Sequence, residues 1–86
     1  MKTHRSKLID DFFTITDKVT YEKTLVKMTI AKKISKGMAK QKIGKKDLAL
    51  KMLQQPSVVT KWLSGGHNFT IDTLVELQNQ LKIKLI

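Results

Sequence analysis

Residues 55–66 read QPSVVTKWLSGG, and this stretch decides the fold. Pro56 suits the first position of a helix, where its missing N–H would have no partner in any case, and Gln55 would then be the N-cap. Gly65 suits the left-handed conformation in which many helices end. Between them, three apolar residues share one face at spacings of three and four: Val59, Trp62 and Leu63. The pattern predicts a helix over residues 56–64 that is anchored on one side only.

The segments on either side of this helix also have helical spacing. A short helix is predicted over residues 45–53, with Leu48, Ala49 and Met52 buried, and a longer one over residues 70–82 with Thr70 as its N-cap. Further upstream, residues 21–41 carry one apolar stripe, made of Leu25, Met28, Ala31, Ile34 and Met38. Gly37 interrupts that stripe, which suggests close packing against another helix. Residues 83–86 alternate apolar and polar side chains, so they fit either a terminal strand or a tail.

The first 20 residues are less regular, and we expect them to form an N-terminal arm. Their apolar residues fit a short amphipathic turn or helix, at Leu8, Ile9, Phe12 and Phe13. The β-branched run at residues 14–16 indicates a break, after which Thr20 would cap a helix that begins at Tyr21. The sequence therefore predicts an all-α protein with an arm at residues 1–20 and a domain at residues 21–86.

The net charge of +10, from 17 basic and 7 acidic residues, limits the partners. Residues 27–51 hold nine lysines and a single acid, Asp47. Such a field attracts nucleic acid, an anionic membrane surface or an acidic protein. Few aromatic residues argue against single-stranded RNA, and residues 21–41 lack the bulky aromatic face of an interfacial membrane helix. Because cysteine is absent and no apolar run is long enough to span a bilayer, we expect a cytoplasmic protein without membrane contact.

Nothing in the sequence indicates an enzyme. There is no cysteine nucleophile, no paired-carboxylate pattern and no glycine loop of the kind that holds phosphate. His4 and His67 are far apart and lack the spacing of metal ligands. We therefore expect neither catalysis nor a cofactor nor a metal.

Two short helices with a tight connection suggest a helix-turn-helix, in which the second helix enters the DNA major groove. Its outer face would be small because the groove wall comes close, and it consists of Ser57, Val58, Thr60 and Lys61. Three motifs of this chain resemble the Cro/cI-type (xenobiotic response element) family: LAxKM at residues 48–52, PSxVTKWLSG at 56–65 and NFTIDTL at 68–74. The basic segment before them and HNFTIDTLVELQNQL after them are most similar to bacterial HigA-type antitoxins.

The resemblance covers roughly residues 22–82 and implies a lambda-repressor-like bundle of about five helices. It also implies a transcriptional repressor that acts as a homodimer on an inverted repeat in double-stranded DNA. Carried over by position, the base-facing residues are Gln55, Ser57, Val58 and Lys61, to which the outer face adds Thr60. The residues that match phosphate-contacting positions are Lys45, Lys46, His67 and Asn68.

Three further expectations remain open at this stage. The family usually has glycine where this chain has Leu53, and a leucine at positive φ is strained. Either the turn is reshaped, for example by a longer helix before it, or Leu53 packs inward. An alternative function is a protein-interaction module that neutralises a ribonuclease toxin, using residues 8–17 and 21–42. For the dimer surface, we expect exposed apolar residues at the C-terminal end: Leu81, Ile83, Leu85 and Ile86.

Overall fold

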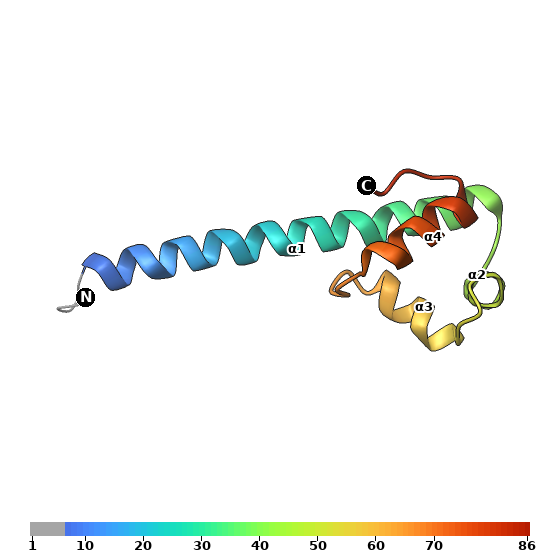
Figure 1. Cartoon of the computed structure of the whole chain (residues 1–86), viewed down its shortest axis with the longest axis horizontal. Helices are drawn as coiled ribbons and strands as arrows, with labels where there is room; N and C mark the ends of the chain where they lie inside the picture. Colours follow the sequence, from blue (N-terminus) through green and yellow to red (C-terminus); the bar gives the residue numbers. More distant parts are fainter. Residues whose placement is uncertain (1–6) are drawn as a thin grey trace.

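Four helices make up the part of the chain that the computed structural model describes, which is residues 7–86 for the backbone and residues 17–86 for side chains. They are α1 (Lys7–Gln41), α2 (Lys45–Lys51), α3 (Pro56–Leu63) and α4 (Ile71–Leu81). No strand occurs between residues 7 and 86, so the predicted all-α class is confirmed (Figure 1).

Helix α1 runs without a break for 35 residues, which corrects the sequence analysis at two points. Residues 14–16 do not interrupt it, and Thr20 lies within it rather than at its N-cap. No proline or glycine occurs between Lys7 and Lys36, and β-branched residues lower helix propensity by only about half a kcal/mol each. The helix expected in the arm and the one expected from Tyr21 are therefore one element. This leaves four helices in the described part, not about five, and the domain boundary expected at residue 20 falls inside α1.

The ends of the shorter helices follow the local signals in the sequence. Gln55 is the N-cap of α3 and Pro56 its first residue, while Gly65 beyond its end has φ +87°. The backbone N–H of Thr73 donates to Oγ1 of Thr70 at 3.2 Å, which caps α4 as predicted. Helix α2 follows Gly44, whose N–H donates to Oδ2 of Asp47 at 3.2 Å.

The hydrophobic core lies where the C-terminal part of α1 meets α3 and α4, with α2 packed against α3. Its most deeply buried side chains come from all four helices: Ile34, Leu48, Val59, Leu77 and Leu81. Ala31 and Met38 of the predicted stripe are buried as well. Leu25 and Met28 of the same stripe are 44% and 54% exposed, so its N-terminal end lies outside the core.

The C-terminal residues fold back over the core as an irregular tail, not a strand. Lys82 takes the left-handed conformation (φ +57°) and turns the chain. Oε1 of Gln78 then accepts the N–H groups of Leu85 at 2.6 Å and Ile86 at 2.8 Å. Leu81 and Leu85 are 1% and 7% exposed, so the expectation that they lie on an open surface is wrong, and only Ile86 is largely exposed.

Gly37 lies where this tail crosses α1. A Cβ at this position would be 3.1 Å from Cγ2 of Ile83 and 3.3 Å from Cβ of Leu81. The predicted close approach is confirmed, and the neighbours are the end of α4 and the tail.

The shape is set by α1. The molecule measures 56 × 22 × 21 Å, and a helix of 35 residues is about 52 Å long at ~1.5 Å per residue. The N-terminal half of α1 therefore projects from the domain (Figure 1). Among the described residues, no helix combines the length and apolar character that a bilayer span requires.

Candidate functional site

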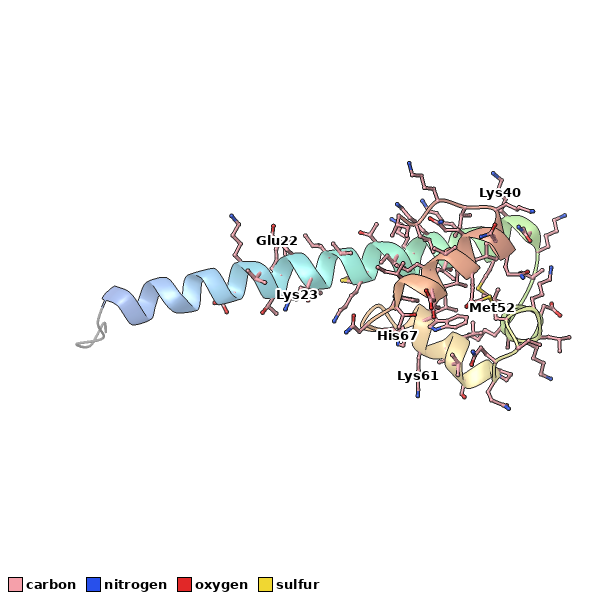
Figure 2. All side chains as sticks on the ribbon, in the orientation of Figure 1. Glu22, Lys23, Lys40, Met52, Lys61 and His67 are labelled. Carbon is pink, nitrogen blue, oxygen red and sulfur yellow. The ribbon has the colours of Figure 1, made fainter. Side chains whose placement is uncertain are left out.

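Helix α3 is held to the domain by one face and leaves the other open. Val59 is fully buried and Trp62 is 3% exposed, and the helix packs against both α1 and α2. On the opposite face, Ser57, Thr60 and Lys61 are exposed. The side chain of Lys61 points away from the rest of the domain (Figure 2). The outer face of α3 is thus narrow and accessible, as the spacing of its apolar residues predicted.

The hydroxyl groups of Thr60, within α3, and Ser64, at its C-cap, make different hydrogen bonds. The Thr60 hydroxyl donates to the Pro56 carbonyl at 3.4 Å, and its oxygen keeps a lone pair that can accept from a ligand. At the C-terminal end, the Ser64 hydroxyl donates to the Lys61 carbonyl at 2.7 Å and accepts the N–H of Gly66 at 3.2 Å. These bonds fix the end of the helix, so the outer face is presented on a well-defined backbone.

Two of the predicted base-contacting residues sit at the edge of this face. Gln55 is exposed at the N-cap, and no side-chain cap bond holds it there. Val58 is half-buried and packs against the core, so only part of it is open to a partner. Val58 is therefore partly a packing residue, which its place in the sequence did not indicate.

The connection between α2 and α3 shows neither a longer α2 nor an inward-packed Leu53. Helix α2 ends at Lys51, so it is not longer, and the Leu53 side chain is 90% exposed, so it does not pack inward. Leu53 instead takes the left-handed conformation itself, at φ +56°. The Leu53 N–H donates to the Leu50 carbonyl at 3.2 Å and the Gln54 N–H to the Ala49 carbonyl at 2.8 Å, the bond pair of a Schellman motif.

Helices α1 and α4 also end with a residue in the left-handed conformation, in both cases a lysine. Lys42 has φ +59° and Lys82 has φ +57°, and the following residues, Ile43 and Ile83, donate to carbonyls five positions back at 3.0 and 3.2 Å. A left-handed non-glycine residue costs about 1 kcal/mol or more. Burial of the segments on both sides of each turn maintains these conformations.

The four residues expected to contact phosphate are divided between two places. Lys45 and Lys46 are the first two residues of α2 and are exposed. His67 and Asn68 lie in the loop after α3 and line a groove against α1. In Figure 1, α3 lies between α2 and this loop. The His67 ring is half-buried and meets the Phe69 ring edge-on, with centroids 4.7 Å apart at 85°. The His67 ring therefore packs against Phe69, and only part of it is accessible to a partner.

The groove beside this loop was missed by the sequence analysis. It has a volume of about 750 Å³ and is open and mainly apolar. Val19, Val26 and Ile30 of α1 form one wall, and Phe69, Leu74 and Leu85 contribute to the other. In the sequence, the spacings of seven and four from Val19 through Val26 to Ile30 indicate this apolar face, which lies beside the stripe through Leu25.

Among the described side chains, no three histidine, cysteine or carboxylate residues lie close enough to hold a metal ion. Comparison of the chain with family models, with curated proteins and with solved structures gives no match.

Proposed function

We propose that this chain is a bacterial transcriptional regulator that binds duplex DNA sequence-specifically as a repressor, with α3 in the major groove. One observation carries the proposal: the exposed, narrow face of α3 at Ser57, Thr60 and Lys61, backed by buried Val59 and Trp62. A helix in the major groove needs such a face, because base edges are reached only by short side chains or by long ones that extend outward. Lys61 has the chemistry to donate to O6 or N7 of guanine.

The surroundings of α3 support the proposal. Helix α2, the four-residue connection and α3 then act as a helix-turn-helix in a lambda-repressor-like domain. Lys45 and Lys46 are placed at the exposed start of α2, where a backbone phosphate would meet them. The net charge of +10 favours association with a polyanion, and lysine suits phosphate as a point charge.

The test begins with selection of bound sites from random duplex DNA. We expect an enriched sequence with two-fold symmetry, as a homodimer on an inverted repeat requires. Enrichment of no sequence above the starting pool would contradict the proposal.

Variants then separate base reading from phosphate binding. Lys61→Ala should change the preference at one base pair per half-site, by about 1–3 kcal/mol. Lys46→Ala should weaken binding to all sequences alike and lower the slope of log affinity against log salt by about 1. Lys18→Ala, in the projecting half of α1, is the matched control and should leave base preference unchanged. If Lys61→Ala and Lys46→Ala both behave like this control, α3 does not read DNA.

The loop after α3 lies apart from the start of α2, so its contact with DNA can be tested separately. Asn68 is exposed and lies on the groove side, so Asn68→Ala reports whether the bound duplex extends that far. Contact with phosphate predicts uniform weakening with a smaller effect on the salt slope than Lys46→Ala, because an amide releases no counterion.

A further inference from the structure

The projecting half of α1 carries an apolar seam, which we define as Val19, Val26 and Ile30. Val19 and Val26 are 41% and 58% exposed, and Ile30 is half-buried where α1 enters the domain. In sequence, the same register continues toward the N-terminus at Ile15 and Phe12. The steps of four, seven, four and three keep these residues on one side of the helix, as in helices that pair lengthwise, with one seam position skipped at the charged pair Glu22–Lys23.

This half of α1 has little packing within its own chain. Of residues 17–29, all except Lys27 are exposed. An isolated helix of this length is marginal in water, since most helical stability in proteins comes from packing of an apolar face. The seam is also continuous with the groove lined by Phe69 and Leu85, so one elongated partner can cover both.

Charge identifies that partner. Residues 8–22 hold four acidic residues and one lysine, a net charge of −3. Residues 23–41 of the same helix hold six lysines and no acid, a net charge of +6. Two copies of α1 in parallel would set six lysines beside six lysines. Two antiparallel copies set the acidic half of each beside the basic half of the other, which is the complementary arrangement.

We propose that a second copy of this chain binds along the seam, with the two α1 helices antiparallel and the acidic half of each extending toward the groove of the other copy. Of the C-terminal residues considered in the sequence analysis, this interface includes Leu85 and Ile86, which line the groove, but not Leu81, which is buried. The proposal does not depend on DNA binding, and its tests contain no DNA.

The first test is sedimentation equilibrium of the full chain. We expect a monomer–dimer equilibrium that the double substitution Val19→Ser/Val26→Ser weakens at least about tenfold, because four valine side chains leave the interface of a symmetric dimer. The matched control is Tyr21→Ser/Leu25→Ser. Tyr21 and Leu25 are 64% and 44% exposed, larger than valine, and line neither side of the groove. This control should leave the dissociation constant unchanged.

Fluorescence of Trp62, the one tryptophan of the chain, reports whether the domain stays folded in each variant. It is 3% exposed, so unfolding shifts its emission strongly. A dimer lost with Trp62 still buried supports the seam. Equal weakening by both double substitutions places the contact elsewhere and overturns the proposal.

The second test addresses orientation. The chain has no cysteine, so Lys40→Cys gives a single site for a spin label on exposed α1 surface. Antiparallel pairing predicts a separation of about 40–50 Å between the two labels, from the ~1.5 Å rise per residue. Parallel pairing would place them about 10 Å apart, the usual spacing of packed helices. A short distance overturns the proposal, and so does a chain that stays monomeric at every concentration and associates only with a different protein.

Discussion

The two halves of α1 have the same secondary structure and opposite environments. Beyond residue 30, the helix buries Ala31, Ile34 and Met38 in a core shared with α3 and α4. Before it, residues 17–29 are exposed apart from Lys27. The comparison teaches that burial along one continuous helix depends on what the rest of the chain brings to each face. The exposed half is where we propose that a second copy binds.

The largest effect expected from this contrast comes from comparing a truncation in the buried core, at Leu77 of α4, with one on the exposed half of α1, at Leu25. Leu77→Ala, at a fully buried position, should lower the free energy of unfolding by about 3–5 kcal/mol, through lost burial and the cavity left behind. Leu25→Ala, on the projecting half of α1, should cost less than about 1 kcal/mol. Urea unfolding followed by Trp62 fluorescence measures both, and comparable losses would mean that α1 is packed along its whole length.

A second, smaller effect tests how tightly the tail closes over α1. Gly37→Val should cost about 2 kcal/mol, since Ile83 and Leu81 already lie 3.1 and 3.3 Å from the position of a Cβ. Gly66→Val is the control, because no atom lies within 4 Å of a Cβ there. Thermal unfolding of the two variants should separate them clearly, and equal midpoints would show that the tail moves aside freely.

The C-terminal tail is held in place by the side-chain amide of Gln78. Gln78→Ala removes the acceptor of two backbone N–H groups and should cost about 1–2 kcal/mol. Amide hydrogen exchange is the direct measurement, with protection lost at Leu85 and Ile86. Asn79→Ala, which breaks only a bond to the Val75 carbonyl within α4, should leave those two amides protected.

The smallest expected effect is a gain in stability. Leu53→Gly should raise the free energy of unfolding by about 0.5–1 kcal/mol, because glycine takes the left-handed conformation without a Cβ clash. Leu53→Ala keeps a Cβ and should leave stability nearly unchanged, as the leucine side chain is 90% exposed. A higher urea midpoint with an unchanged slope for the glycine variant alone would locate the strain in the backbone. A loss of stability in that variant would show that the exposed side chain contributes.

At the candidate site, the two faces of α3 could be predicted from the sequence, whereas the position of the loop after α3 could not. The anchored and open faces of α3 follow from the spacing of Val59 and Trp62, and the structure has both. His67 and Asn68 were grouped with Lys45 and Lys46 by resemblance, yet they line a groove with α1 on another part of the surface. No local pattern encodes that separation, because it arises from how the loop after α3 packs against a helix 40 residues earlier in the chain.

The sequence by itself determined where the three short helices begin and the side on which α3 is anchored. Pro56, Gly65 and Thr70 act within a turn of their own positions, through backbone geometry and single hydrogen bonds. Tertiary structure decided the left-handed conformation of Leu53, the burial of Leu81 and Leu85, and the exposure of Leu25. The first two depend on contacts between segments distant in sequence, whose apolar burial outweighs local preferences of about 1 kcal/mol. Leu25 is exposed because no distant segment packs over it.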